Sequence, residues 1–198
     1  MEKLEIFGAR KLQGNIKISG SKNAALPILA STILSNKKIY LENLPRVKDI
    51  ETMIKLLESI GSKVKYYKNK NSILIHNNKK IKTYAAYNLV KTMRAGILVL
   101  GPMLARFGKA KVSTPGGCSI GVRPIDIHLK CLAKLGVKYK IIDGYVHAYS
   151  NKKLKGTKIK FPKISVGATE NLIIASTMAE GITVLSNCAI EPEIKDLI

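Results

Sequence analysis

The chain has 198 residues, 46% of them hydrophobic, and a formal net charge of +21. This length and apolar content allow a buried core and exclude a disordered tail. The three cysteines are odd in number and lack the spacing of metal ligands, so they indicate neither a disulfide framework nor a zinc site. No secretory signal is visible, and the longest apolar stretch, at residues 95–105, is interrupted by Gly101 and Pro102. We therefore expect a cytoplasmic protein that binds no metal, no cofactor and no membrane.

The excess of basic residues raises the question of nucleic-acid binding, because lysine and arginine release counterions from a phosphate backbone. The lysines are spread through residues 63–82 and 152–163 and form no basic helix. Tryptophan is absent and phenylalanine is scarce, so the sequence does not indicate a platform for stacked bases. We expect no specific nucleic-acid partner, whereas nonspecific binding at low salt is consistent with the charge.

The N-terminal third predicts a strand, an apolar helix, a second strand, an amphipathic helix and a hairpin. The alternation Ile16-Lys17-Ile18 is typical of a short strand, and a turn is expected at residues 20–23. Gly61 stands where the end of a helix favours a positive φ. The expected ranges are a helix at 24–34, a strand at 38–42, a helix at 45–60, and paired strands at 63–67 and 72–76.

The same order of elements recurs twice along the chain. The second set begins at residues 87–90, in the position of the first strand, and continues with a helix at 92–107, a strand at 111–113, a helix at 124–135 and paired strands at 137–142 and 145–149. The third set has a strand at 157–160, a helix at 168–179, a strand at 182–185 and a helix that begins at Pro192.

Internal repetition supports this division. Residues 41–54 align with residues 185–198, and the helical pattern of residues 50–61 recurs at residues 125–136. The chain is therefore built from βαβαββ units of about 70 residues. The last helix lacks the glycine that ends its siblings, so we expect an α/β fold whose third repeat is truncated at the C-terminus. The alternative is a naturally short capping repeat.

Cys118 lies in a glycine-bracketed loop, between Gly117 and Gly121, shortly before the helix predicted to start at Pro124. The N-terminus of a helix offers free N–H groups and a positive dipole end, which stabilise a thiolate or a bound phosphate. Arg123 would strengthen this effect. The loop therefore indicates a reactive thiol; the alternative is a glycine turn in which the cysteine only fills space.

Five separated motifs in order carry a resemblance to a known family. They lie at residues 19–23, 91–95, 115–128, 165–169 and 191–194. Together they resemble the UDP-N-acetylglucosamine 1-carboxyvinyltransferase family, the enolpyruvyl transferases of peptidoglycan synthesis. The related enolpyruvyl transferases of the shikimate pathway share the architecture but are not known for the Pro-Gly-Gly-Cys stretch at residues 115–118, which favours the cell-wall family.

The resemblance implies a fold and a domain organisation. Family members have two lobes, each an inside-out α/β barrel of three βαβαββ units, with the active site in the cleft between them. In this chain, residues 21–198 would form the first lobe, incomplete at its C-terminus, and residues 1–20 would belong to the missing second lobe.

The resemblance also implies a reaction, the transfer of enolpyruvate from phosphoenolpyruvate to the 3-hydroxyl of UDP-N-acetylglucosamine, the first committed step of peptidoglycan synthesis. Both substrates would be partners of the chain. We expect the truncated form to be inactive alone, because half a cleft neither excludes water nor closes over its substrates. The alternative is a noncatalytic half-protein that binds the nucleotide sugar or pairs with a separately encoded second lobe.

Residue roles follow from the family motifs. Cys118 matches the proton donor, and Lys22 and Asn23 match contacts to phosphoenolpyruvate. Contacts to UDP-N-acetylglucosamine are implied at Arg94, Arg123, Pro124, Ile125, Asp126, Ile127, Lys163, Ile164, Ser165 and Val166.

Several of these side chains also have structural interpretations. Without its motif, Lys22 in so basic a chain is more often a solvated surface lysine, and Asp126 is explained as a partner of its helix dipole. Arg94 in an apolar helix needs a partner for its charge. His128 is either an acid or base beside the loop or a histidine packed on a helix face, whereas Cys131 and Cys188 are expected in the core.

Overall fold

The computed structural model describes residues 3–8, 11–78, 80–116 and 125–198 of the chain. Its helices are α1 Lys22–Ser31, α2 Lys48–Ser59, α3 Tyr87–Val90, α4 Leu100–Phe107, α5 Asp126–Lys134, α6 Val166–Ser176 and α7 Pro192–Leu197, with 3₁₀ turns η1 Thr32–Leu34, η2 Lys68–Lys70 and η3 Arg94–Val99. Its strands are β1 Lys38–Leu41, β2 Lys63–Tyr67, β3 Ser72–His76, β4 Tyr84–Ala85, β5 Lys109–Ser113, β6 Lys138–Ile142, β7 Tyr145–Tyr149, β8 Lys158–Lys160 and β9 Val184–Ser186.

Within the described residues, the strands form three separate sheets, one for each expected repeat. The strand orders are β1-β3-β2, β4-β5-β7-β6 and β8-β9. Two antiparallel hairpins, β2 with β3 and β6 with β7, close the first two units, whereas β4 pairs with β5 and β8 with β9 in parallel. The predicted βαβαββ order is thereby confirmed for the second unit, whereas in the first unit the first described element is α1.

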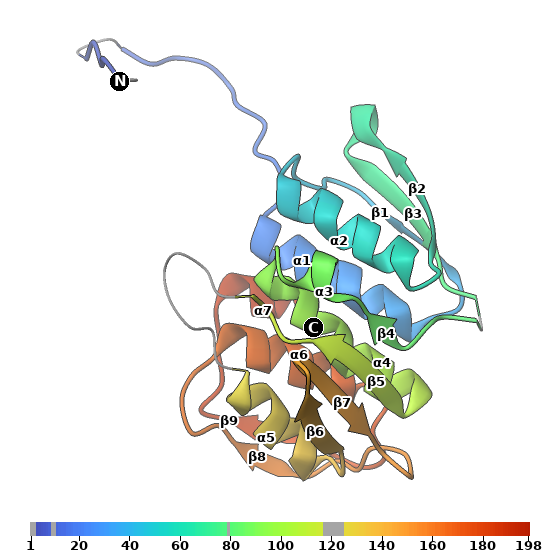
Figure 1. Cartoon of the computed structure of the whole chain (residues 1–198). Helices are drawn as coiled ribbons and strands as arrows, with labels where there is room; N and C mark the ends of the chain where they lie inside the picture. The colour runs from blue at the N-terminus through green and yellow to red at the C-terminus, as the bar shows by residue number, and fades with distance from the viewer. Residues whose placement is uncertain (1–2, 9–10, 79, 117–124) are drawn as a thin grey trace.

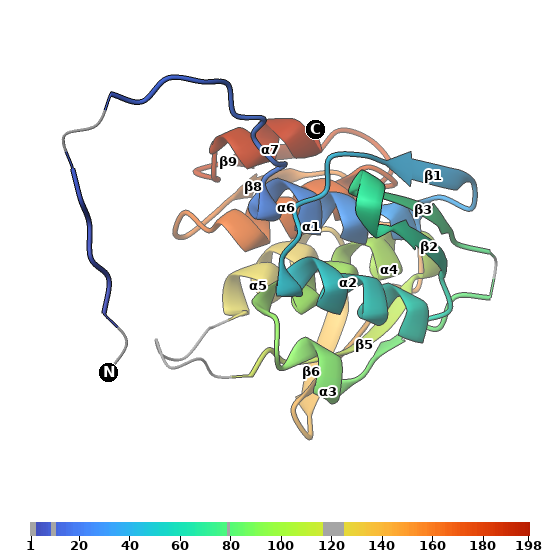
Figure 2. The same ribbon diagram turned by 90° about the horizontal axis from the view of Figure 1, so that it is seen from above.

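Helices occupy the middle of the molecule and the sheets lie outside them (Figures 1 and 2). α4 packs against α6, α1 against α2 and α5 against α6. Leu29 of α1, Leu100 of α4 and Leu172 of α6 are completely buried. α1 and α6 are apolar around most of their circumference, as is typical of helices that other helices surround. This is the inside-out arrangement expected from the sequence.

Local signals located several elements well. The hairpin strands β2 and β3 have the predicted bounds, with η2 at the turn. Gly61 and Gly136 follow α2 and α5 with φ angles of 104° and 97°, which lie in the region that favours glycine. Cys131 is buried and Cys188 packs against the core, as predicted.

The strand expected at residues 16–18 is wrong. Ile16 and Ile18 are 86% and 78% exposed, and the described residues from 3 to 21 contain no helix or strand. This N-terminal segment extends away from the body in Figures 1 and 2. Alternation of apolar residues yields a strand only where a neighbouring strand accepts and donates the backbone hydrogen bonds, and no described strand lies beside this segment.

Two further expectations in the second unit need correction. Residues 87–90 form the short helix α3 and not the first strand of the unit. That strand is β4, which pairs in parallel with β5 at Lys111 and Val112. The helix expected at residues 92–107 divides into η3 and α4. Pro102 has no N–H for an α-helical hydrogen bond to the preceding turn, so it is accommodated in the first turn of α4, where such donors have no helical partner.

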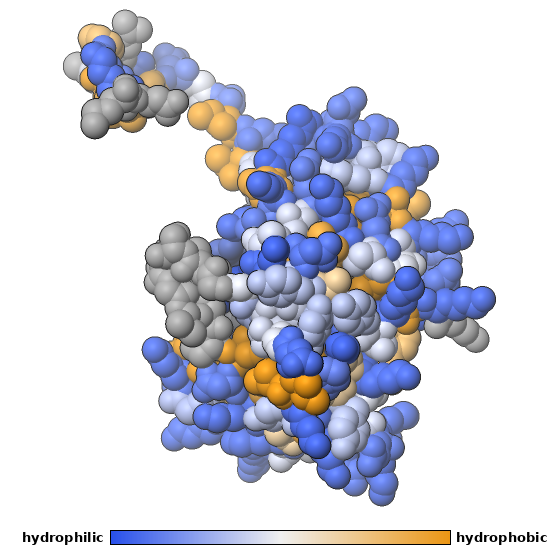
Figure 3. All heavy atoms as spheres, viewed as in Figure 1, coloured by the Kyte–Doolittle hydropathy of each residue, from blue (hydrophilic) through white to orange (hydrophobic). Residues whose placement is uncertain are grey.

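The lysine content predicts a largely polar surface. The face shown in Figure 3 is hydrophilic over most of its area. Within the described ranges, no helix combines the length and apolar character that crossing a bilayer requires.

Candidate functional site

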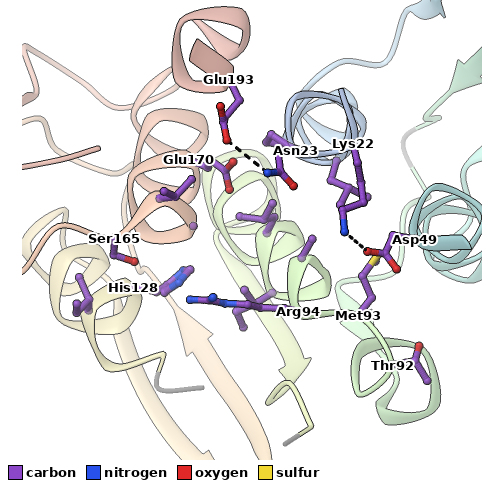
Figure 4. A pocket seen from close by; sticks show the side chains of 18 of the residues that line it. Lys22, Asn23, Asp49, Thr92, Met93, Arg94, His128, Ser165, Glu170 and Glu193 are labelled. Carbon is purple, nitrogen blue, oxygen red and sulfur yellow. Dashed lines mark hydrogen bonds and ion pairs between the residues drawn. The ribbon is translucent and has the colours of Figure 1, made fainter. Parts of the chain in front are cut away.

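A cavity of about 860 Å³ lies among α1, α5, α6 and the segment that precedes α4. Most of the site residues expected from the sequence line it, although they come from four separate parts of the chain (Figure 4). These residues are Lys22, Asn23, Arg94, Ile127, Lys163, Ile164, Ser165 and Val166.

The remaining expected residues do not line this cavity or are not described. Ile125 is buried at the start of α5, and Asp126 is exposed on that helix, with its Oδ2 atom 3.5 Å from Lys130 Nζ. Cys118, Arg123 and Pro124 lie outside the described residues. Gly116 and Ile127, which stand on either side of that segment, both line the cavity.

The start of α1 holds the first two site residues. Ser21 caps the helix, because its hydroxyl accepts a hydrogen bond from the backbone N–H of Ala24. Lys22 then begins α1, and its Nζ atom lies 3.1 Å from Asp49 Oδ2, in the first turn of α2. Lys22 is thus not only a solvated lysine: it lines the cavity in an ion pair with Asp49, a residue that the sequence analysis missed.

Asn23 connects α1 with the last helix. Its Nδ2 atom donates a hydrogen bond of 3.5 Å to Glu193 Oε1, in the first turn of α7 (Figure 4). Glu193 belongs to the motif at residues 191–194, yet it was not among the expected site residues. Its position within a recognised motif is the signal that could have identified it.

His128 is 3% exposed on α5, yet it lines the cavity and Arg94 extends toward it (Figure 4). Its Nδ1 atom lies 3.1 Å from Asn171 Nδ2. The pKa of His128 is lowered to about 4, mainly by burial and also by the charge of Arg94, whereas Asp126 opposes the shift. The ring is therefore neutral at neutral pH. Of the two earlier interpretations, the packed histidine is confirmed, but this packed ring also borders the site.

Glu170 on α6 is a cavity residue that the sequence analysis missed. It is 6% exposed and makes no hydrogen bond or ion pair with another described residue. The pKa of Glu170 is raised to about 7, mainly by burial and also by the charges of Glu193 and Glu191, whereas Arg94 acts in the opposite direction. The available signal was that Glu170 is the one charged residue of α6, because burial of a charge needs a reason.

The N-terminus of α6 faces the same space. Ser165 caps this helix by accepting a hydrogen bond of 3.3 Å from the N–H of Ala168, and Val166 and Gly167 follow along the cavity wall. A Cβ atom on Gly167 would stand 3.5 Å from His128 Nε2, so glycine allows α6 to approach the histidine. The helix end and Lys163 together favour a negatively charged ligand group.

The charges around the cavity have both signs. The cationic side chains are Lys22, Lys91, Arg94 and Lys163, and the carboxyl side chains are Asp49, Glu170 and Glu193. Such a wall can bind phosphate and carboxylate groups through its cations and hydroxyl groups through its carboxylates. Among the described residues, no cluster of three or more His, Cys, Asp or Glu side chains is placed to hold a metal ion.

Comparison with proteins of known sequence gives close relatives. The chain is 72% identical over all 198 residues to a UDP-N-acetylglucosamine 1-carboxyvinyltransferase of Pelagibacter ubique, and it covers 47% of that protein. It is 49% identical over 197 residues to a protein of the same name from Aliarcobacter butzleri, of which it covers 46%. The chain thus spans about half the length of these relatives.

Solved structures show the same fold at low sequence identity. The enolpyruvyl transferase NikO from Streptomyces tendae superposes with a TM-score of 0.80 at 17% identity, over 96% of this chain and 44% of NikO. EPSP synthase from Acinetobacter baumannii superposes with a TM-score of 0.72 at 18% identity, over 92% of this chain and 42% of that protein. The sequence profile of EPSP synthase (3-phosphoshikimate 1-carboxyvinyltransferase) matches residues 6–198. The chain therefore belongs to the EPSP synthase family, with the enolpyruvyl transferase fold.

Proposed function

We propose that the chain forms the substrate-binding wall of a UDP-N-acetylglucosamine 1-carboxyvinyltransferase, which transfers enolpyruvate from phosphoenolpyruvate to the 3-hydroxyl of the sugar. One observation carries the proposal: Lys22, Asn23, Arg94 and residues 163–166, predicted separately from distant motifs, line one cavity. The identical name of both close relatives supports it. The reaction would be the first committed step of peptidoglycan synthesis and would take place in the cytoplasm.

The charges of the cavity suit these substrates. Phosphoenolpyruvate carries a phosphate and a carboxylate, and the nucleotide sugar carries a diphosphate, so both need cationic partners. We assign Lys22 and Asn23 to phosphoenolpyruvate. Arg94, Ile127 and residues 163–166 would contact UDP-N-acetylglucosamine, with Arg123 and Pro124 completing its path.

The chemistry requires an acid as well as cations. The 3-hydroxyl loses its proton to a base and its oxygen adds to C2 of phosphoenolpyruvate while C3 accepts a proton; loss of phosphate from C2 and of a proton from C3 then restores the vinyl group in the product. We propose the Cys118 thiol as the proton donor to C3. The position of Gly116 and Ile127 at the cavity supports this role, because both ends of the intervening segment meet the site.

We further propose that residues 21–198 belong to one lobe and that residues 1–20 pack against a second lobe. Six apolar side chains of the N-terminal segment are at least 78% exposed, which is costly unless another surface covers them. They are Leu4, Ile6, Phe7, Leu12, Ile16 and Ile18.

Complementation tests the proposal. The chain would be mixed with a separately produced polypeptide that comprises the part of the Pelagibacter ubique relative beyond the matched region. We expect phosphate release that requires both polypeptides, phosphoenolpyruvate and UDP-N-acetylglucosamine. The Cys118→Ser variant should abolish release, whereas Cys188→Ser, at a half-buried position outside the cavity, should retain it. Absence of release, together with absence of nucleotide-sugar binding by the chain, would contradict the proposal.

A noncatalytic half-protein is the second candidate, and the exposed apolar N-terminal segment is the observation that favours it. In that case the chain would bind UDP-N-acetylglucosamine without phosphate release in any mixture. Calorimetric titration of the chain with the nucleotide sugar, beside the release assay, distinguishes the two candidates.

A further inference from the structure

Asn171 joins three elements beneath the cavity. Its side chain is fully buried on α6, and its Nδ2 atom lies 3.0 Å from the carbonyl oxygen of Ile97 in η3. The same Nδ2 atom lies 3.1 Å from Nδ1 of His128 on α5. One amide nitrogen, with two hydrogen atoms, therefore meets two different partners.

The partners determine which ring nitrogen of His128 carries the proton. A carbonyl oxygen can only accept, so the Ile97 carbonyl requires the nitrogen end of the Asn171 amide to face it. The second N–H of that nitrogen then faces His128 Nδ1, which must accept. A neutral imidazole with Nδ1 as acceptor has its proton on Nε2.

The Nε2 edge of the ring lies next to the cavity wall at Gly167. A Cβ atom on Gly167, a residue of the cavity wall, would stand 3.5 Å from Nε2 and 4.0 Å from an oxygen of Glu170. Arg94 extends from η3 toward the same ring (Figure 4). The charged and titratable groups around the ring are thus Arg94 from η3, Glu170 from α6 and Asp126 from its own helix.

We propose that Asn171 is a positioning residue that holds His128 in the Nε2–H tautomer, so that the neutral ring donates a hydrogen bond to a substrate oxygen beside Arg94. The identity of that oxygen, on a phosphorylated substrate, rests on the proposed function; the tautomer does not. His128 is then a fixed donor and no proton carrier, since protonation of Nδ1 would set two N–H donors against each other. The pKa of about 4 agrees with this arrangement.

Nitrogen NMR of the imidazole rings tests the tautomer directly. The chain has three histidines, so the ring signals of ¹⁵N-labelled protein can be assigned with His76 and His147 as internal references. At pH 7 we expect Nδ1 of His128 at the frequency of an unprotonated nitrogen and Nε2 at that of a protonated one. An Nδ1–H tautomer or a doubly protonated ring in the unmodified chain would overturn the proposal without any variant.

Asn171→Asp is the informative substitution, because it replaces the donor by an acceptor of the same size. The carboxylate would accept from Nδ1–H, so the two nitrogen frequencies of His128 should exchange. Asn77→Asp is the matched control, since Asn77 is also fully buried and donates to a backbone carbonyl, that of Thr32. It should leave the His128 signals unchanged. An unchanged tautomer in folded Asn171→Asp protein would contradict the role of Asn171.

Titration with UDP-N-acetylglucosamine adds the functional readout. In the unmodified chain, the Nε2 signal of His128 should shift more than its Nδ1 signal. Asn171→Asp should weaken binding of the nucleotide sugar about tenfold, the loss expected for one hydrogen bond to a charged group. Binding that leaves Nε2 unmoved would overturn the substrate contact. If the nucleotide sugar moves no signal at all, the proposed function fails, while the tautomer measurement still decides the role of Asn171.

Discussion

Lys22 Nζ lies 3.1 Å from Asp49 Oδ2, so the lysine that begins α1 is already paired with a carboxylate of α2. Both groups are partly exposed, which limits the strength of this ion pair in water. An anionic ligand that binds Lys22 must compete with the carboxylate.

Removal of this competitor should improve anion binding. We expect Asp49→Asn to bind phosphoenolpyruvate about threefold more tightly, in line with the energy of a partly exposed ion pair. Glu51→Gln is the control. Glu51 lies on α2, as Asp49 does, but it pairs with Lys68 away from the cavity. The measurement is an NMR titration with phosphoenolpyruvate; weaker binding by Asp49→Asn would show that Asp49 positions Lys22 and does not compete.

Arg106 should be important for stability. Its Nη1 atom donates to the carbonyl oxygens of Ile33 and Ser35, at 2.7 and 3.1 Å, and thereby joins α4 to the end of η1. We expect Arg106→Ala to lower the free energy of unfolding by about 2 to 3 kcal/mol, because two partly buried carbonyls lose a charged donor. Urea denaturation measures the change.

Arg46→Ala is the matched control for Arg106. Arg46 also makes two hydrogen bonds, to Asn71 Oδ1 and to the carbonyl of Lys68, but on the exposed surface. We expect Arg46→Ala to lower the free energy of unfolding by less than about 1 kcal/mol. Equal losses for the two variants would contradict the importance assigned to burial.

Gly101 shows a conflict between helix propensity and packing. Alanine is favoured over glycine inside a helix by about 1 kcal/mol. A Cβ atom at position 101, however, would stand 2.6 Å from the backbone oxygen of Asn171, where α4 crosses α6. We expect Gly101→Ala to destabilise the protein by about 2 to 3 kcal/mol. Gly8→Ala, where a Cβ atom would meet nothing within 4 Å, should be nearly neutral in the same urea experiment.

Glu170 should make stability depend on pH. The fold raises its pKa from 4.5 to about 7, so the folded state retains a proton that the unfolded state has lost. The contribution to stability is therefore complete below pH 4.5 and is lost as the pH rises toward and beyond 7.

Glu170→Gln should remove the loss of stability at rising pH, because glutamine does not ionise. We expect the variant to gain about 1 to 2 kcal/mol relative to the unmodified chain between pH 4.5 and pH 8, less than the full shift because solvent in the cavity screens the carboxylate. Urea midpoints at both pH values measure the gain. Glu58→Gln, at an exposed position of α2, should show no such dependence. The opposite sign for Glu170→Gln would mean that the carboxylate is stabilised in the folded protein.

Elements that depend on nearby residues could be predicted from the sequence. The hairpin of β2 and β3, the apolar helix α1 and the glycine ends of α2 and α5 follow from periodicity and turn chemistry within a few residues. The strand expected at residues 16–18 and the position of β4 could not be predicted, because a strand is defined by its partner. The partner of β4 is β5, distant in the sequence.

The sequence by itself determined the family motifs, and with them the placement of Lys22, Asn23, Arg94 and residues 163–166 at one site. It did not reveal Asp49, Glu170 or Asn171, which lie outside the five motifs. Only the tertiary structure decided their roles, because an ion pair, a raised pKa and a histidine tautomer depend on which groups packing brings within a few ångströms. Asn171 and His128 are far apart in the sequence, and they meet because α5 packs on α6.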